Sequence, residues 1–141
     1  MRGAALDALR HIAVCILVVE DEFLIRLIVS EELADAGFQV REAENGDVAA
    51  GLIEAGAADF SLLITDIHMP GRLSGVDVGR LMRIHRPTVP IIYTTGRPDA
   101  LNVVGRLGVN EAFVQKPFAP SDLLAIARRL LEKANPPTPL Q

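Results

Sequence analysis

The chain has 141 residues, half of them hydrophobic, which suits one domain with a well-buried core. Its formal net charge is −4, and this acidic balance gives no general attraction for nucleic acid or for an anionic membrane. The longest apolar run, Ile12 to Val19, is far shorter than the roughly 20 residues of a membrane-spanning helix. We therefore expect a soluble, cytoplasmic protein in which Cys15, the single cysteine, is a small buried hydrophobic residue.

Short apolar runs alternate along the chain with segments whose apolar residues recur at helical spacing. The apolar runs, interpreted as strands, cover Val14–Val19, Gln39–Ala43, Ser61–Thr65, Pro90–Thr94 and Glu111–Val114. The helical segments cover Phe23–Ala36, Gly46–Ala55, Gly75–His85, Asp99–Leu107 and Pro120–Ala134. Gly37 after the first helix, and Asn45 and Ser74 before the second and third, are suitable caps. This alternation predicts an α/β fold, a parallel sheet with helices on both faces.

The two ends of the chain differ from the part between them. We expect one domain over residues 12–134. Residues 1–11 are typical of a short extra helix or a frayed arm. Residues 135–141 include three prolines, which favours an extended, flexible tail.

Polar side chains follow four of the expected strands. Glu20 and Asp21 come directly after the first apolar run, and Asp66 follows the third. Thr95 follows the fourth run, and Lys116, one of only two lysines, follows the fifth. Because the carboxyl ends of parallel strands meet at one edge of a sheet, we expect these side chains to lie close together.

Three carboxylates at one edge repel one another by several kcal/mol unless a cation lies among them. The available ligands are hard oxygens, which favours Mg²⁺, or else Mn²⁺, over zinc. A divalent ion beside an ammonium group and a hydroxyl group is also what a phosphoryl group requires. Taken singly, the acidic residues after the first strand would be solvated loop charges, Asp66 a turn former and Lys116 a surface residue. Their expected convergence favours a phosphoryl site.

Four segments of the chain resemble the four signature stretches of response-regulator receiver domains. They are Leu17–Glu22 (LVVEDE), Leu63–Pro70 (LITDIHMP), Ile91–Gly96 (IIYTTG) and Phe113–Phe118 (FVQKPF). The resemblance runs from about Val14 to Leu131 and implies a flavodoxin-like, doubly wound sheet of five parallel strands in the order 2-1-3-4-5. It also implies a role in two-component signalling, as a single-domain response regulator.

The resemblance assigns a role to each polar residue at the edge. Asp66 would accept a phosphoryl group from the phosphohistidine of a histidine kinase or a phosphotransfer protein, forming an aspartyl phosphate. Glu20 and Asp21 would hold Mg²⁺ together with Asp66 and the backbone carbonyl of His68, whose side chain we expect to lie exposed beside the site. Lys116 would pair with a phosphoryl oxygen. Glu20 stands where the family more often has Asp.

The same resemblance implies how the signal is made and how long it lasts. Thr95 would hydrogen-bond the phosphoryl group, and its movement would let Phe113 change rotamer. The Lys116–Pro117 peptide bond is expected to be cis. His68 and Arg97 occupy positions that tune phosphoryl lifetime in the family, and we expect them to shield the acyl phosphate from water. The turn from Pro70 to Gly75 is one residue longer than the family's common form.

The signal would leave the protein through a surface that changes on phosphorylation. The family usually exchanges partners, or forms homodimers, through the face made by the fourth helix, the fifth strand and the fifth helix. We expect an unknown downstream protein there. We expect no enzyme activity beyond self-phosphorylation from a phosphodonor and autodephosphorylation.

Three other interpretations remain open from the sequence. A phosphatase of the haloacid-dehalogenase type also uses a strand-end Asp with Mg²⁺, but it needs a second Asp where this chain has His68. An interaction module that kept the fold and lost the chemistry would not need the complete polar set. The chain could also be the receiver part of a larger, for example DNA-binding, regulator that continues beyond Pro136.

Overall fold

The computed structural model describes residues 14–97, 99 and 105–134 of the chain. Its strands are β1 (Cys15–Val19), β2 (Gln39–Ala43), β3 (Phe60–Asp66), β4 (Ile91–Thr95) and β5 (Glu111–Gln115). Its helices are α2 (Phe23–Asp35), α3 (Gly46–Glu54), α4 (Gly75–His85) and α6 (Pro120–Ala134). The strands form one parallel sheet in the order β2-β1-β3-β4-β5, which confirms the predicted fold.

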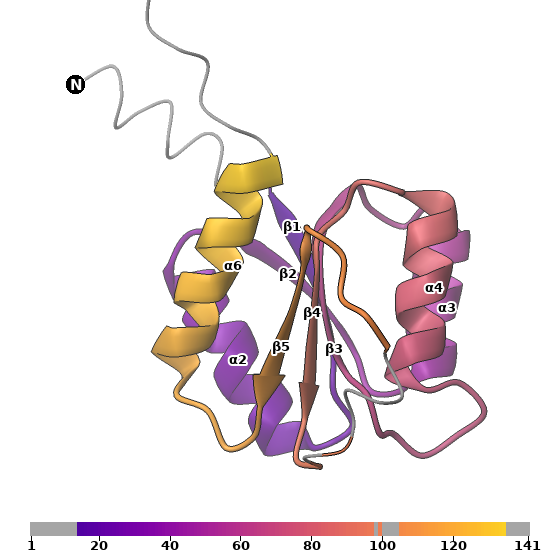
Figure 1. The fold of residues 1–141 in the computed structure, drawn as a ribbon, viewed down its shortest axis with the longest axis horizontal. Helices are drawn as coiled ribbons and strands as arrows, with labels where there is room; N and C mark the ends of the chain where they lie inside the picture. The colour runs from indigo at the N-terminus through magenta and orange to yellow at the C-terminus, as the bar shows by residue number, and fades with distance from the viewer. Residues whose placement is uncertain (1–13, 98, 100–104, 135–141) are drawn as a thin grey trace, which may run out of the picture.

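Helices cover both faces of the sheet. Figure 1 shows the sheet nearly edge-on, with α2 and α6 on one side and α3 and α4 on the other. Alternate strand residues therefore enter two separate cores: Leu17 and Leu63 face α3 and α4, whereas Ile16 and Leu62 face α2 and α6. All four of these side chains are fully buried, and each contributes about 1.5–3 kcal/mol of hydrophobic stabilisation. Burial on both faces explains why β1 and the middle of β3, Leu62 to Ile64, are apolar without alternation.

The helix ends follow the predicted caps. Asn45 accepts a hydrogen bond from the Val48 N–H at 2.8 Å, and Ser74 forms a reciprocal capping box with Asp77. Gly37 has a φ of 98°, the left-handed conformation in which a glycine ends a helix. These local contacts fix where α3 and α4 begin.

One predicted helix is not as expected. The helix predicted over 99–107 falls largely on undescribed residues, but residues 105–107 are not helical. Gly105 has a φ of 80°, which a right-handed helix cannot continue, so the prediction was wrong at that end. The arm predicted at 1–11 and the tail at 135–141 lie outside the described residues.

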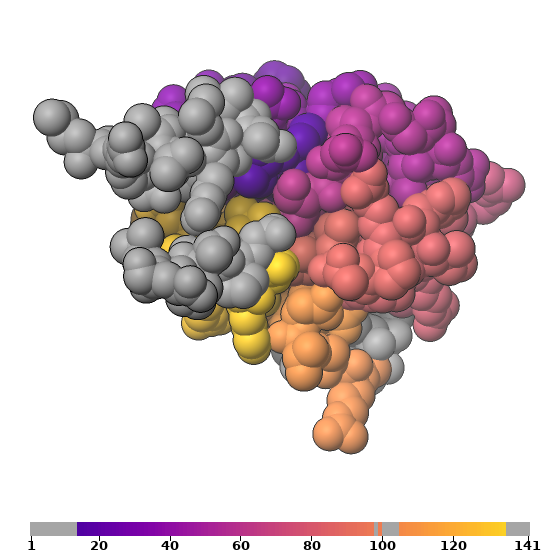
Figure 2. Space-filling view, turned by 90° about the horizontal axis from the view of Figure 1, so that it is seen from above, coloured from indigo at the N-terminus to yellow at the C-terminus, as the bar shows by residue number. Residues whose placement is uncertain are grey.

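The strands point their carboxyl ends toward one end of the molecule. Figure 2 shows the opposite end, with α3 and α4 to one side and α6 to the other. Cys15 begins β1 near this end and is buried, as predicted. Among the residues with described positions, no helix has the length and apolar character needed to cross a membrane.

Candidate functional site

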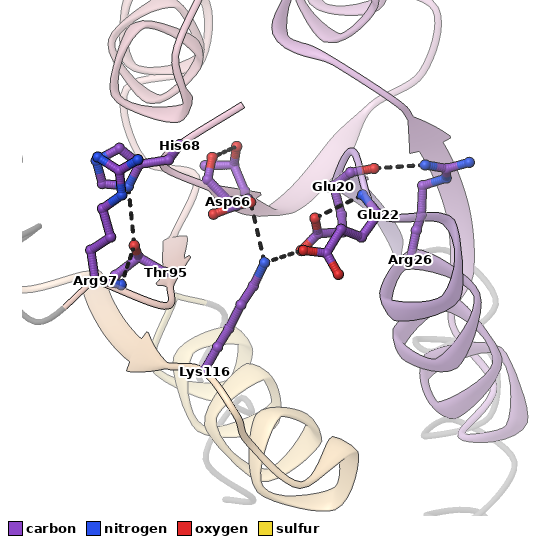
Figure 3. Close-up of polar contacts among 9 residues, drawn as sticks. Glu20, Glu22, Arg26, Asp66, His68, Thr95, Arg97 and Lys116 are labelled. Atoms are coloured by element: carbon purple, nitrogen blue, oxygen red, sulfur yellow. Dashed lines mark hydrogen bonds and ion pairs between the residues drawn. The ribbon is translucent and has the colours of Figure 1, made fainter. Parts of the chain in front are cut away.

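The polar residues predicted at the strand ends converge at the carboxyl edge of the sheet. Glu20 follows β1, Asp66 ends β3, Thr95 ends β4, and Lys116 follows β5. Figure 3 shows Glu20 and Asp66 on either side of the Lys116 side chain, which extends between them. Glu20, Asp66 and Thr95 are buried, with exposed fractions of 3%, 5% and 1%. Carboxylates buried to this extent need charged partners.

Lys116 is the cationic partner of both buried carboxylates. Its Nζ donates to Glu20 Oε1 at 2.5 Å and to Asp66 Oδ2 at 3.2 Å. The Lys116 N–H donates to the Thr95 carbonyl at 2.7 Å, which places the base of the side chain beside β4. The Lys116–Pro117 peptide bond is cis, the isomer that the sequence analysis expects. Lys116 therefore binds two carboxylates that lie 96 and 50 positions before it in the chain.

Burial sets the protonation behaviour of this cluster. Desolvation raises the pKa of Glu20 to about 7, although hydrogen bonds from Lys116 and from the Glu22 N–H act against the rise. Desolvation likewise raises the pKa of Asp66, against the opposing charge of Lys116. Burial alone would lower the pKa of Lys116, but its contacts with Glu20 and Asp66 raise it above its ordinary value. The ammonium group is thus held in its charged form.

The acidic residues offer a set of oxygen ligands. Glu20, Asp21 and Asp66 each have one carboxylate oxygen within 4.8 Å of the others'. Hard oxygen donors in this number suit Mg²⁺, which binds a few carboxylates and keeps some of its water. Lys116 supplies only one positive charge to the buried carboxylates, so a divalent ion fits the charge of the site as well as its chemistry.

Arg26 binds the backbone of the loop that carries Glu20 and Asp21, and it was not predicted from the sequence as a site residue. Its Nη1 donates to the carbonyl of Glu20 at 2.7 Å, and its Nε donates to Glu42 Oε1 on β2 at 3.2 Å. The side chain is only 14% exposed. A basic residue one turn into the helix that follows the carboxylates was the available signal. Arg26 thus joins α2, β2 and the end of β1 at the site, and Figure 3 shows its bond to the Glu20 carbonyl.

Gly75 was also missed as a site residue, although it was correctly predicted to begin a helix. Its N–H donates to the carbonyl of Ile67 at 2.9 Å, which brings the start of α4 against the end of β3. A Cβ atom at position 75 would overlap the carbonyl oxygen of Asp66. Only glycine lets the helix start this close to the strand that carries Asp66.

The Thr95 hydroxyl is engaged on the other side of Asp66. It lies 3.1 Å from His68 Nδ1 and accepts a hydrogen bond from the Arg97 N–H at 3.1 Å. The side chain of His68 is therefore partly buried and bonded, not exposed as expected, because a hydroxyl group lies within its reach across the β3 and β4 ends. The side chain of Arg97 is exposed, and Phe113 is partly buried and packs against the core facing α3 and α4.

Two pockets flank the polar cluster. One of about 390 Å³ is bordered by His68, Met69, Pro70, Ser74 and Arg97, among others. The other, of about 490 Å³, lies beside Lys116 and is mostly apolar. Ile25, Ile28, Val29, Pro117 and Phe118 line it. The cluster therefore has a pocket of mixed polar and apolar lining on one side and a mostly apolar pocket on the other.

Comparison with known proteins agrees with this arrangement. The family model for the response regulator receiver domain matches residues 16–128, and the chain belongs to that family. A solved receiver protein from Sinorhizobium medicae superposes with a TM-score of 0.80 at 29% identity, covering 87% of this chain and 98% of that one.

Two curated relatives are larger proteins. The transcriptional regulatory protein ResD of Bacillus subtilis is 34% identical over 122 residues, which are 85% of this chain and 49% of ResD. The phosphate regulon transcriptional regulatory protein PhoB of Pseudomonas aeruginosa is 34% identical over 124 residues, which are 86% of this chain and 53% of PhoB. The chain thus spans about half the length of these relatives.

Proposed function

We propose that this receiver domain is a phosphorylation-dependent signalling switch with Asp66 as the phosphoryl acceptor. The observation that carries the proposal is the position of the Asp66 carboxylate, which is buried, bonded to the Lys116 ammonium group and within 4.8 Å of the oxygens of Glu20 and Asp21. A carboxylate placed beside a fixed cation and a divalent-ion site is suited to attack phosphorus and to tolerate the charge that develops.

The transfer step follows from the chemistry of the carboxylate. An oxygen of Asp66 attacks the phosphorus of a phosphohistidine on a histidine kinase or phosphotransfer protein. The new O–P bond forms as the P–N bond breaks, and the imidazole leaves with the bonding pair. Lys116 moves its hydrogen bond from Asp66 to a phosphoryl oxygen. Bound Mg²⁺, or Mn²⁺, held by Glu20, Asp21, Asp66 and the His68 carbonyl, would neutralise phosphoryl charge.

The surface around the site supports a protein as donor. Phe23, Leu24 and Ile28 on α2 are exposed to 61%, 68% and 49%, and Ile28 lines the apolar pocket beside Lys116. Exposed apolar side chains next to a reactive group are typical of a surface that a partner covers. We propose that the kinase or phosphotransfer protein docks there.

We further propose that output passes through Thr95 and Phe113. When Thr95 turns to the phosphoryl group, Phe113 changes rotamer, and the surface of β5 and α6 favours a downstream protein or a second copy of the chain. His68 and Arg97 shield the acyl phosphate. The domain would act in the cytoplasm, without itself binding nucleic acid or membrane, and would not turn over other substrates.

The larger regulators among the relatives favour a second candidate, in which the receiver controls a further domain. That role requires the same chemistry at Asp66. It differs in the target of the conformational change, which a full reading frame would identify.

The proposal is tested by incubating the protein with Mg²⁺ and acetyl phosphate and measuring intact mass. We expect one added phosphoryl group, lost in alkali as an acyl phosphate is, and none on Asp66→Asn. Asp122→Asn, at an exposed position in the first turn of α6, is the matched control and should be labelled like the parent. An unlabelled parent, or equal labelling of Asp66→Asn, would refute the proposal. Steady hydrolysis of a phosphate ester would instead support a phosphatase.

A further inference from the structure

The Thr95 hydroxyl is directed to His68 in this structure. Oγ1 lies 3.1 Å from His68 Nδ1, and the Arg97 N–H donates to the same oxygen. In Figure 3 the dashed lines from this hydroxyl run to His68 and Arg97, whereas the line from the Asp66 carboxylate runs to Lys116. Thr95 is 1% exposed, so bulk water does not compete for the hydrogen bonds of its hydroxyl.

A phosphoryl group on Asp66 needs the hydroxyl for itself. Phosphoryl oxygens only accept hydrogen bonds, so Thr95 must donate its single proton to one of them. If Thr95 donates that proton to His68 Nδ1, the histidine competes directly with the phosphoryl group for it. If Nδ1–H donates instead, the ring still holds the oxygen in its present direction. In both cases turning Thr95 toward Asp66 breaks the contact with His68.

We propose that the His68 imidazole is a latch that holds Thr95 in the unphosphorylated arrangement and thereby opposes activation. His68 is then a positioning residue acting through Thr95, a role separate from its backbone carbonyl and from shielding the acyl phosphate. This proposal rests on the proposed function of Asp66 as acceptor.

The surroundings of His68 agree with a movable latch. The ring is partly buried and borders the pocket of about 390 Å³, which gives it space to leave Thr95. Arg97 borders the same pocket, and its N–H shares the Thr95 oxygen. When Thr95 turns, both contacts are affected together, so the segment after β4 senses the state of Asp66.

The latch is tested with side chains that keep or lose the hydrogen bond. His68→Leu retains bulk beside the site but cannot bond to Thr95. His68→Asn places an amide where Nδ1 lies and can keep the bond. The probe is beryllofluoride, an analogue of the phosphoryl group, with its affinity measured by calorimetry at a fixed, saturating Mg²⁺ concentration. His68→Ala repeats the test with a smaller side chain.

We expect His68→Leu and His68→Ala to bind beryllofluoride about two- to ten-fold more tightly than the parent, the range that corresponds to one net hydrogen bond. His68→Asn should bind like the parent. In a Thr95→Val background the gain from His68→Leu should vanish, because the latch has nothing left to hold. A gain that persists without the hydroxyl would be a merely structural effect and would overturn the latch.

The outcomes separate the two proposals. A parent that is neither labelled by acetyl phosphate nor bound by beryllofluoride refutes the function of Asp66. If the parent is labelled and binds beryllofluoride, but His68→Leu binds it with equal or lower affinity, only the latch is refuted. Weaker binding would mean that the imidazole contacts the phosphoryl group in the active state.

Discussion

Replacing Glu20 by Gln should change how the stability of the metal-free protein depends on pH. In the folded protein burial raises the pKa of Glu20 from 4.5 to about 7. Between these two values the folded state binds more protons than the unfolded state, so the free energy of unfolding falls as pH rises. A rise from 4.5 to about 7 corresponds to about 3 kcal/mol. The raised pKa of Asp66 acts in the same direction.

The assay is urea unfolding in EDTA at a series of pH values between 4.5 and 8. The parent should lose about 3 kcal/mol more than Glu20→Gln over this interval, since Gln cannot titrate. Glu54→Gln, at an exposed position in α3, is the matched control and should follow the parent. Parallel curves for the parent and Glu20→Gln would refute the link between burial of Glu20 and its pKa.

Saturating Mg²⁺ should reverse the slope for the parent. The ion binds the ionised carboxylates of the folded state, so it stabilises the protein more as pH rises. Glu20→Gln should gain less from the ion at every pH, because one of the three clustered ligands has lost its charge. Equal stabilisation of both proteins by Mg²⁺ would contradict Glu20 as a ligand.

Substitutions of two further residues, Gly75 and Arg26, test the contacts that support the site, with Gly51 as a control position. Gly75→Ala should destabilise the protein by about 1–3 kcal/mol in urea unfolding, because its Cβ overlaps a β3 carbonyl, whereas Gly51→Ala in α3, where the Cβ meets no atom within 4 Å, should stabilise it by about 1 kcal/mol. Equal effects would contradict the close approach. Arg26→Ala should weaken Mg²⁺ binding about 10-fold in calorimetry, because it frees the Glu20 carbonyl, and Arg26→Lys should recover part of the loss. Unchanged affinity would mean that Arg26 only packs.

The sheet could be predicted because its strands are buried on both faces. Short apolar runs mark β1, β3 and β4 in the sequence, and the ends of these strands in the structure differ from the predicted ones by a single residue. β2 is mostly exposed, so its apolar pattern is weak. It could still be predicted because, in the sequence, it lies between two helices whose patterns are clear. The prediction of a helix over 99–107 was wrong at its end because Gly105 adopts a positive φ. Glycine can adopt either sign of φ, and the sequence pattern does not show which one it takes.

The site was predictable to the extent that topology decides it. Strand order brings Glu20, Asp66, Thr95 and Lys116 to one edge without any information on side-chain contacts. What could not be predicted depends on backbone atoms and on close approach. The place of Arg26 one turn into α2 marks it as a candidate, but its partner is a backbone carbonyl, and every residue has one, so the sequence does not identify the partner. The contact of His68 with Thr95 joins side chains 27 positions apart, and only the register of β3 with β4 sets their distance.

The hydrogen bond between Gly75 and Ile67 has a consequence for the turn over the site. It closes residues 68–74 into a loop at its base, so β3 and α4 are fastened to each other whatever the loop does above them. The turn that the sequence analysis expects to be one residue longer than the family's common form ends where α4 begins, at Gly75, as the helical pattern predicts. We expect the length between Met69 and Leu73 to affect the geometry of Asp66 little, because the loop is closed below these residues. We expect insertions in this segment to be tolerated better than insertions at Ile67 or Gly75, because they leave the hydrogen bond at the base of the loop in place.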